Sequence, residues 1–317
     1  MESSISKEQF DKFTAFLVAR HSIYLARKAW KPAPWTTDPV LREGHFCNIF
    51  RELDRVTIWI RENIREPFAD HPYLWFMLCI ARYINRPQTL AHLLNTQGCW
   101  PSHPTFKPEN MTALLADMAA RGETIFTGAY LITPCAPSMK PESTWPKYKY
   151  ISETVLGRLW EDRKQWGDRL DKATVPSLQA TWDWFQQPRY VGWGPFMAYE
   201  VVTDLRHTRY LRNAFDIYTW ANAGPGAFRG LNRLHGRPLT ERQSQQKACE
   251  EMQALWCDVC QVDTKEFNDV FGPFEGEDCG TPRFEMRDIE HSLCEFDKWC
   301  RVTLGQGQMR MKYHGRV

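Results

Sequence analysis

Apolar side chains recur at every third or fourth position through most of this chain, and this spacing limits the fold more than any other feature of the sequence. Side chains at that interval fall on one face of an α-helix, which can then pack against a core. The pattern predicts helices over residues 9–30, 40–64, 74–84, 89–94, 111–121, 151–166, 175–185, 196–205, 227–234, 240–260 and 288–301. Residues 124–134 suggest a short strand or an extended loop. We therefore predict an all-α fold, as a single helical domain over residues 1–317 or as two lobes of about residues 1–150 and 151–317.

The composition is that of a folded protein with a substantial core. The chain has 317 residues, of which 43% are hydrophobic and 25% charged, and these values are typical of globular domains. Its 14 tryptophans are many for this length, and they suit a core, a partner surface or a platform on which bases stack. Because the net charge is only +2, a nucleic-acid ligand would need a local basic patch.

The chain has no run of about 18 apolar residues, and its N-terminal residues are too polar for a signal peptide. We expect a cytoplasmic protein without a membrane partner, whose ten cysteines are mostly reduced. Cys257 and Cys260 have the C-x-x-C spacing of a metal-binding pair, with Cys249 and Cys279 nearby. Since no second pair with standard spacing accompanies them, metal binding stays an alternative to small buried side chains.

The segment from Asp216 to Leu234 carries the strongest local signal. It reads D-I-Y-T-W-A-N-A-G-P-G-A-F-R-G-L-N-R-L, and its Gly-Pro-Gly centre predicts a sharp turn ahead of a helix. The free N–H groups at the start of that helix favour an anion, and two arginines four residues apart add positive charge. We predict a phosphate site formed by Gly224, Gly226, Arg229 and Arg233.

Upstream of this turn lie three side chains suited to recognition or catalysis. Asp216 is a carboxylate, Trp220 offers a flat stacking surface, and Asn222 has an amide that both donates and accepts hydrogen bonds. The alternative is a structural corner with a buried tryptophan, solvated arginines and an Asp or Asn that caps a helix. No lysine of a Walker motif follows the glycines, so the segment by itself leaves both alternatives open.

A second glycine turn, Gly192-x-Gly194, leads into the predicted helix over residues 196–205. Such a turn between two helices exposes N–H groups that can contact a DNA phosphate. On the following helix, Glu200 and Asp204 are four residues apart and share a face. They suit a metal ion or acid–base catalysis, or they are a surface pair of carboxylates.

Three further stretches concentrate polar or basic side chains. Within the predicted helix over residues 40–64 we expect an exposed, ion-paired face that carries His45, Asn48, Arg51, Glu52, Asp54 and Arg55. The tail over residues 305–317 is basic, and residues 140–150 mix lysines with aromatic rings. Both patterns are found in mobile segments and in segments that bind nucleic acid.

Three segments together resemble a known family. They are P-W-T-T-D-P-V-L ahead of F-R-E-L-D-R-V-T, then the second glycine turn with the segment from Asp216 to Leu234, and finally D-I-E-H-S-L-C-E-F-D-K-W-C-R. In this order they are similar to the phage alpha-glutamyl/putrescinyl-thymine pyrophosphorylases, or amino acid:DNA transferases. The same helical module also occurs joined to 5-hydroxymethyluracil DNA kinases. The resemblance spans roughly residues 15–313.

The resemblance implies a fold similar to that of helix-hairpin-helix DNA glycosylases, with two lobes flanking a DNA cleft and a base flipped out of the duplex. It implies hypermodification of thymine in bacteriophage DNA, in which an amino acid or polyamine displaces pyrophosphate from diphosphate-activated 5-hydroxymethyluracil. In this transferase reaction the predicted phosphate site would hold the diphosphate, and Trp220 would stack on the flipped base. Asp216 would deprotonate the amine or stabilise positive charge on the methylene carbon, with Asn222, Glu200 and Asp204 as further catalytic residues.

The resemblance also bears on partners and cofactors. The remaining expected base or DNA contacts are Gly192, Gly194, Trp35, Arg51, Lys298 and Arg301. No P-loop sequence is present, so we expect the 5-hydroxymethyluracil DNA kinase to be a separate partner acting upstream. No metal ligand is assigned, and a Mg²⁺ ion that bridges the diphosphate through Glu200, Asp204, Glu290 or Glu295 remains open.

Two alternative functions remain. A base-flipping DNA glycosylase or other repair enzyme would share the fold. It is disfavoured because Phe196, Met197 and Ala198 follow Pro195, where the lysine nucleophile of a glycosylase is expected. A non-catalytic DNA-binding module that presents DNA to a kinase would have little need for a compact set of acid, amide and anion-binding groups.

Overall fold

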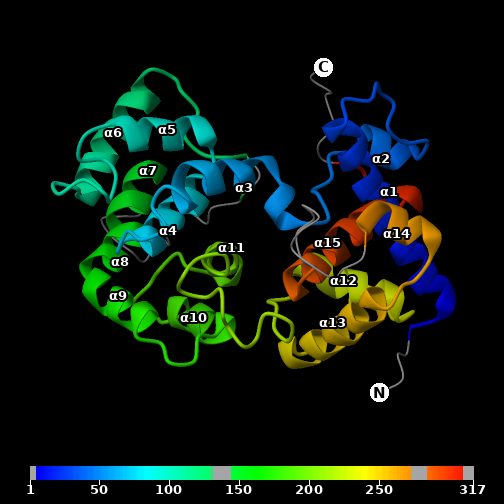
Figure 1. Ribbon diagram of the computed structural model, residues 1–317. Helices are drawn as coiled ribbons and strands as arrows, with labels where there is room; N and C mark the ends of the chain where they lie inside the picture. Colours follow the sequence, from blue (N-terminus) through cyan, green and yellow to red (C-terminus); the bar gives the residue numbers. More distant parts are fainter. Residues whose placement is uncertain (1–4, 129, 131–143, 273–283, 310–317) are drawn as a thin grey trace. The chain divides into compact units, whose positions relative to one another are not determined.

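The computed structural model describes residues 5–128, 130, 144–272 and 284–309, and every regular element in these ranges is a helix (Figure 1). The predicted all-α fold is therefore confirmed for this part of the chain. No helix in these ranges is both long and apolar enough to cross a lipid bilayer.

The chain divides into two compact units. Unit 1 is formed by residues 1–54 together with residues 217–317, and unit 2 by residues 55–216. Unit 2 is thus one continuous stretch inserted into the sequence of unit 1, with its boundaries after Asp54 and Asp216, whereas the sequence suggested two lobes that meet near residue 150.

Unit 1 is built around its last helix. Its helices are α1 (Lys7–Lys28), α2 (Pro39–Glu43), a 3-10 helix (Arg51–Leu53), α12 (Pro225–Leu234), α13 (Gln245–Cys260), α14 (Lys265–Phe271) and α15 (Met286–Thr303). Helix α15 contacts α1, α2, α12, α13 and the 3-10 helix, and it lies among them in Figure 1. Its Phe296 packs edge-on against Phe13 and Phe16 of α1, with ring centroids 5.3 and 5.7 Å away. These contacts bury α15 on most of its sides.

Glycines allow α12 to approach α15 closely. A Cβ atom on Gly230 would lie 2.5 Å from the carbonyl oxygen of Leu293, and one on Gly226 would lie 2.6 Å from Sγ of Cys294. Because neither position has room for a side chain, both glycines set the distance between the two helices.

Unit 2 has helix α4 (Leu74–Ile84) in its core, buried at every position. Its other helices are α3 (Arg55–Ile60), a π-helix (Arg61–Arg65), α5 (Pro87–Asn95), α6 (Pro108–Ala120), α7 (Lys147–Lys149), a π-helix (Tyr150–Leu156), α8 (Gly157–Glu161), α9 (Arg163–Asp171), α10 (Leu178–Phe185) and α11 (Pro195–Leu205). Helix α4 packs against α11, α5 and both π-helices, and α11 also packs against α10.

A buried ion pair joins α4 to α11. The guanidinium of Arg82 donates to both carboxylate oxygens of Asp204, from Nε at 2.5 Å and from Nη2 at 2.6 Å. The Nη2 group also donates to Oγ1 of Thr57 in α3 at 3.1 Å. Since the side chains of Arg82 and Asp204 are 1% and 2% exposed, each charge depends on the other for its solvation.

Several tryptophans form part of the core of unit 2. Trp75, Trp100 and Trp166 are fully buried, and the ring of Trp166 stacks on that of Trp75 with centroids 5.2 Å apart. Trp166 also contacts Trp184 at 3.8 Å between centroids. In unit 1, by contrast, Trp30 is 93% exposed.

The periodicity located most helices closely. Helix α4 has the predicted bounds, and α1, α5, α6, α10, α11, α12, α13 and α15 begin and end within about five residues of prediction. The segment over residues 151–166 is divided between a π-helix, α8 and α9, and helix α14 was not predicted. Residues 124–128 form no strand, and residues 129, 131–134, 140–143 and 310–317 lie outside the described ranges.

The single helix predicted over residues 40–64 is wrong. The chain leaves helix α2 at Gly44, follows a loop, and resumes with the 3-10 helix, α3 and a π-helix. In the loop, Oδ1 of Asp54 accepts a hydrogen bond from the backbone N–H of Asn48, and Nδ2 of Asn48 donates to the carbonyl of Leu53. These side chains replace the helical hydrogen bonds, as Asn and Asp commonly do.

The close approach of α12 and α15 predicts opposite effects for two helical glycines. Gly230→Ala is expected to lower the free energy of unfolding by about 1–3 kcal/mol, because the added methyl meets the backbone of α15. Gly167→Ala in α9, where a Cβ atom meets nothing within 4 Å, is expected to raise it by about 0.5–1 kcal/mol. Denaturant unfolding followed by circular dichroism measures both. A stabilised Gly230→Ala variant would contradict the packing.

The Arg82–Asp204 pair predicts that Asp204, which the sequence suggested for catalysis, is needed for the stability of the fold. Asp204→Asn is expected to destabilise the protein by about 3–5 kcal/mol, because it leaves the charge of Arg82 buried and unpaired. Asp168→Asn, which removes an exposed ion pair to Lys172 on α9, is the control and should cost less than about 1 kcal/mol. If the two variants lost equal amounts of stability in thermal unfolding, the buried pair would contribute no more to stability than the exposed one.

His21 of α1 predicts acid-sensitive stability in unit 1. Its ring is 1% exposed and stacks on Phe271 and Tyr24, and burial, with Arg20 and Lys28, lowers its pKa to about 4. Between that pKa and the unfolded value of about 6.5, the unfolded chain binds a proton that the folded chain does not, so stability falls as the pH falls. The loss from this group between pH 7.5 and pH 5 is expected to be about 2 kcal/mol.

Urea unfolding at the two pH values measures this loss. His21→Phe keeps an aromatic ring and should reduce the pH dependence, whereas the same change at the exposed His92 of α5 should leave it unchanged. An identical pH dependence in wild type and His21→Phe would exclude His21 as its source.

Candidate functional site

Helix α15 carries four buried carboxylates, which we call the α15 carboxylates: Asp288, Glu290, Glu295 and Asp297. They are between 1% and 8% exposed. Because a buried carboxylate is costly unless it is paired or hydrogen-bonded, each must find a donor in the segments packed around α15. Those donors come from the segments that the sequence singled out.

Two of the α15 carboxylates bind the backbone of residues 46–54, which we call the 46–54 loop. Oδ1 of Asp288 accepts from the N–H of Arg51 at 3.1 Å, and Oε2 of Glu295 accepts from the N–H of Cys47 at 2.9 Å. Asp288 also caps its own helix by accepting from the N–H of Glu285 at 3.0 Å. Burial, together with the nearby Glu285, raises the pKa of Asp288 to about 8.

Glu290 lies at the N-terminus of α12. Its Oε1 accepts from the N–H of Gly224 at 3.2 Å, and its Oε2 accepts from Nη1 of Arg287 at 3.1 Å. Gly224 and Gly226 are half-buried and Pro225 is exposed, so the turn remains at the surface of unit 1. The predicted anion site therefore has a carboxylate at the end of α12 where its dipole favours negative charge.

Asp297 holds the two predicted phosphate-binding arginines. Its Oδ2 accepts from Nε of Arg229 and its Oδ1 from Nε of Arg233, both at 2.8 Å. Arg233 is 9% exposed and also donates from Nη2 to Gln306, whereas Arg229 is 39% exposed. Of the two, Arg229 is the one whose side chain faces solvent.

The 46–54 loop is fixed from its other side by α1. The Nη2 group of Arg20 donates to the carbonyl of Phe46 at 2.9 Å and to Oδ1 of Asn48 at 2.8 Å. Within the loop, Nη1 of Arg51 lies 3.3 Å from Oδ2 of Asp54. The expected ion pairing is therefore present, and His45 and Arg55 are exposed, but Asn48, Arg51, Glu52 and Asp54 are half-buried and the segment is not one helical face.

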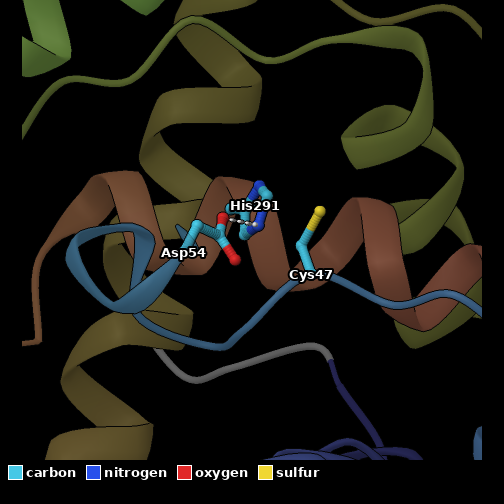
Figure 2. Close-up of side chains that lie close together, drawn as sticks. All are labelled: Cys47, Asp54 and His291. Atoms are coloured by element: carbon cyan, nitrogen blue, oxygen red, sulfur yellow. Dashed lines mark ion pairs between the residues drawn. The ribbon is translucent and has the colours of Figure 1, made fainter. Parts of the chain in front are cut away.

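Three side chains of different chemistry meet where this loop covers α15 (Figure 2). Cys47, Asp54 and His291 each offer one ligand atom, and these atoms lie within 4.8 Å of one another. Nε2 of His291 is 3.9 Å from Oδ2 of Asp54. Desolvation of the Cys47 thiol raises its pKa, and the carboxylates of Glu295 and Asp54 raise it further. A thiol, an imidazole and a carboxylate together are potential metal ligands.

The sequence interpretation missed Cys47 and His291 as members of a site. His291 lies in the D-I-E-H segment that carried part of the resemblance, and Asp54 lies in F-R-E-L-D, but Cys47 lies outside the quoted segments. No local spacing rule joins the three, because two come from the 46–54 loop and one from α15.

The predicted catalytic carboxylates Asp216, Glu200 and Asp204 all lie in unit 2 and are buried. Asp216 accepts from Oγ of Ser177 at 2.7 Å and from the N–H groups of Leu178 and Gln179 at 2.8 and 3.0 Å, at the start of α10. Glu200 accepts from the hydroxyl of Tyr130 at 2.7 Å, and Asp204 pairs with Arg82. The alternative that Glu200 and Asp204 are surface carboxylates is therefore wrong.

The two glycines of the second turn also lie in unit 2. Gly192 has φ +85°, and a Cβ atom there would lie 2.8 Å from Cγ2 of Val155, so the turn requires glycine. The hydroxyl of Tyr83 donates to its carbonyl. Gly194 is exposed and caps α11, which gives the predicted order of helix, glycine turn and helix.

The remaining predicted base and DNA contacts, and the predicted catalytic residue Asn222, lie in unit 1. Trp220 is half-buried and Asn222 is 8% exposed. Trp35 donates from Nε1 to the carbonyl of Lys31 at 2.7 Å, with the guanidinium of Arg27 over its ring. Lys298 donates to Glu295 at 2.8 Å and to the carbonyl of His45 at 3.1 Å, while the Arg301 side chain lies close to Gly307.

The cysteines with the C-x-x-C spacing lie on α13. Cys257 is exposed and Cys260 is half-buried, and Cys249 donates from Sγ to the carbonyl of Ala221 at 3.0 Å. Cys279 lies outside the described residues.

Comparison with known proteins gives a family for the chain. A family model described as "5-hmdU DNA kinase, helical domain" matches residues 7–309. A 5-hmdU DNA kinase of Bacillus phage SP10 is 29% identical over 238 residues, which cover 70% of this chain and 35% of that relative. The chain thus spans about a third of the length of the curated relative it matches. No solved structure matches the chain. Because the family model covers nearly all of its length, the chain belongs to the family of 5-hmdU DNA kinase helical domains.

Proposed function

We propose that this protein acts in the hypermodification of thymine in phage DNA, inside the host cell. In the proposed reaction an amino acid or a polyamine is transferred to diphosphate-activated 5-hydroxymethyluracil, and pyrophosphate is released. Membership in the 5-hmdU DNA kinase helical-domain family supports the link to hydroxymethylated uracil, because the matched relative is named for it.

One structural observation carries the proposal. Two segments that are far apart in sequence converge on α15 within unit 1: the 46–54 loop through Cys47 and Arg51, and the α12 segment through Gly224 and the two arginines that pair with Asp297. Arg51, the α12 segment and α15 belong to segments on which the resemblance to amino acid:DNA transferases rests, and Cys47 lies just before one of them. A shared site would account for the polar residues that the 46–54 loop and α12 direct toward α15.

The α12 N-terminus and Arg229 are the proposed contacts of the diphosphate. Backbone N–H groups and the helix dipole favour anionic oxygens at this turn. The carboxylate of Glu290 occupies the N–H of Gly224, so the diphosphate would have to displace it there. Asp297 accepts a hydrogen bond from Nε of Arg229. The structure shows no partner for the two Nη groups of Arg229 among the described residues. Those groups are therefore available for the charge that develops on the leaving diphosphate.

The chemical step needs a proton acceptor for the amine. The amine nitrogen forms a bond to the methylene carbon of the base while the carbon–oxygen bond to the diphosphate breaks, and one amine proton is given up. The assignment of this role to Asp216 stays a prediction, as do the roles of Asn222, Glu200 and Asp204. Asp216 would have to give up one of its three hydrogen bonds to accept a proton from the amine.

The decisive experiment offers the full chain a duplex that contains diphosphate-activated 5-hydroxymethyluracil, with glycine, serine, glutamate or putrescine in parallel. Mass spectrometry of the nucleosides and a pyrophosphate assay report transfer. Arg229→Gln is expected to lower the rate about 100-fold with little change in DNA binding, because the lost contact is stronger in the transition state. Arg42→Gln, on exposed α2 of the same unit, is the matched control and should keep full activity.

Other outcomes identify the alternatives. The matched relative is a kinase of which this region makes up about a third, which favours a non-catalytic module that presents DNA to a kinase as the second candidate. That function predicts DNA binding without pyrophosphate release. Release of free base, or abasic DNA, would instead identify a glycosylase.

A further inference from the structure

The group formed by Cys47, Asp54 and His291 is not used by the proposed transfer reaction. It brings a sulfur, a nitrogen and an oxygen ligand atom within 4.8 Å of one another. In a tetrahedral zinc site, with metal–ligand distances of about 2.0–2.3 Å, ligand atoms are about 3.5 Å apart. Small side-chain rotations would therefore bring all three onto one ion.

We infer that Cys47, Asp54 and His291 form a binding site for a zinc-type divalent cation, with a fourth coordination position for water or a substrate atom. One thiolate and one carboxylate would balance the two positive charges of the ion. Such a mixed set suits zinc and disfavours magnesium, which takes oxygen ligands in octahedral geometry. Open zinc sites with three protein ligands are typical of catalytic rather than purely structural centres.

The two ligands from the 46–54 loop, Cys47 and Asp54, are already held in place. The backbone N–H of Cys47 is held by Glu295, and Oδ1 of Asp54 is held by the N–H of Asn48. Oδ2 of Asp54 lies between Nη1 of Arg51 at 3.3 Å and Nε2 of His291 at 3.9 Å. Arg20 holds the loop at Phe46 and Asn48. Outer contacts of this kind orient ligands in metal sites and are as important as the ligands themselves.

Two features of the surroundings favour a metal site over a nucleophilic cysteine and over a metal bound by the α15 carboxylates. A nucleophilic cysteine has a cation that outweighs its other surroundings and stabilises its thiolate, whereas at Cys47 burial and the carboxylates of Glu295 and Asp54 outweigh the nearby Lys298 and Arg51. The α15 carboxylates Glu290 and Glu295 are engaged with Gly224, Arg287, Cys47 and Lys298. The three-residue group adds a sulfur and a nitrogen ligand atom and is therefore a stronger candidate for a zinc-type ion than Glu290 and Glu295.

The test loads the chelator-treated full chain with Co²⁺, which reports thiolate ligation through a charge-transfer absorption band, and then with Zn²⁺ as competitor. We expect one ion per chain by elemental analysis, and a cobalt band that zinc abolishes. Cys47→Ala and His291→Ala should lose the band. Cys257→Ala with Cys260→Ala, which removes the C-x-x-C pair of α13, should keep it.

A band that survives Cys47→Ala, or its loss in the α13 variant, would place the metal elsewhere and overturn the assignment. Wild-type protein that takes up no cobalt and no zinc would also overturn it. X-ray absorption of the wild-type zinc protein needs no variant and therefore does not depend on how the variants fold. One sulfur with two or three nitrogen or oxygen neighbours is expected, and no sulfur or several sulfurs would contradict the site.

Arg51 provides a test of opposite sign. Its guanidinium lies 3.3 Å from the Asp54 oxygen that would bind the ion, so it competes with the metal. Arg51→Gln is therefore expected to bind Co²⁺ about fivefold more tightly, from the loss of roughly 1 kcal/mol of competing ion pairing. Weaker binding in this variant would remove Asp54 from the coordination sphere. Because none of these measurements uses DNA, they stand or fall independently of the transfer reaction.

Discussion

The buried carboxylates of α15 are the constraint on which the rest of unit 1 depends. An ionised carboxylate in a protein core is tolerated only where N–H or guanidinium groups replace its water. Asp288, Glu290, Glu295 and Asp297 each obtain at least one such group from the 46–54 loop or from the α12 segment, and three of them also accept from α15 or its N-cap. The course of the 46–54 loop and the placement of α12 are therefore both consequences of the charges carried by one central helix.

The same pairing defines the electrostatics of the predicted anion site. Glu290 places negative charge at the N-terminus of α12, and Asp297 neutralises two arginines that would otherwise repel each other across one helical turn. The charges on this side of α15 thus largely neutralise one another, and carboxylate oxygens already lie there.

Unit 2 follows the same physical rule with different partners. Arg82 and Asp204 join α4 to α11, Tyr130 binds Glu200, and Asp216 binds the start of α10. A carboxylate near a glycine turn can therefore act in catalysis or cap a helix. The sequence alone does not distinguish these roles, because both need a hydrogen-bond acceptor surrounded by ordered donors. Only the surrounding donors separate the two, and these come from other elements.

The sequence by itself determined the helical class of the protein and the bounds of helices such as α4, because periodicity and turn residues act over a few positions. It also marked the Gly224 turn, the Gly192 turn and the α15 segment as unusual. It did not determine the course of the 46–54 loop, where a helix was expected. There Asn48 and Asp54 bond to the loop itself, and the loop depends on partners such as Glu295, which is 248 positions from Cys47. Only the tertiary structure brought Cys47, Asp54 and His291 together, since each residue is ordinary in its own segment and their chemistry arises from proximity between a loop and a helix from opposite ends of the chain.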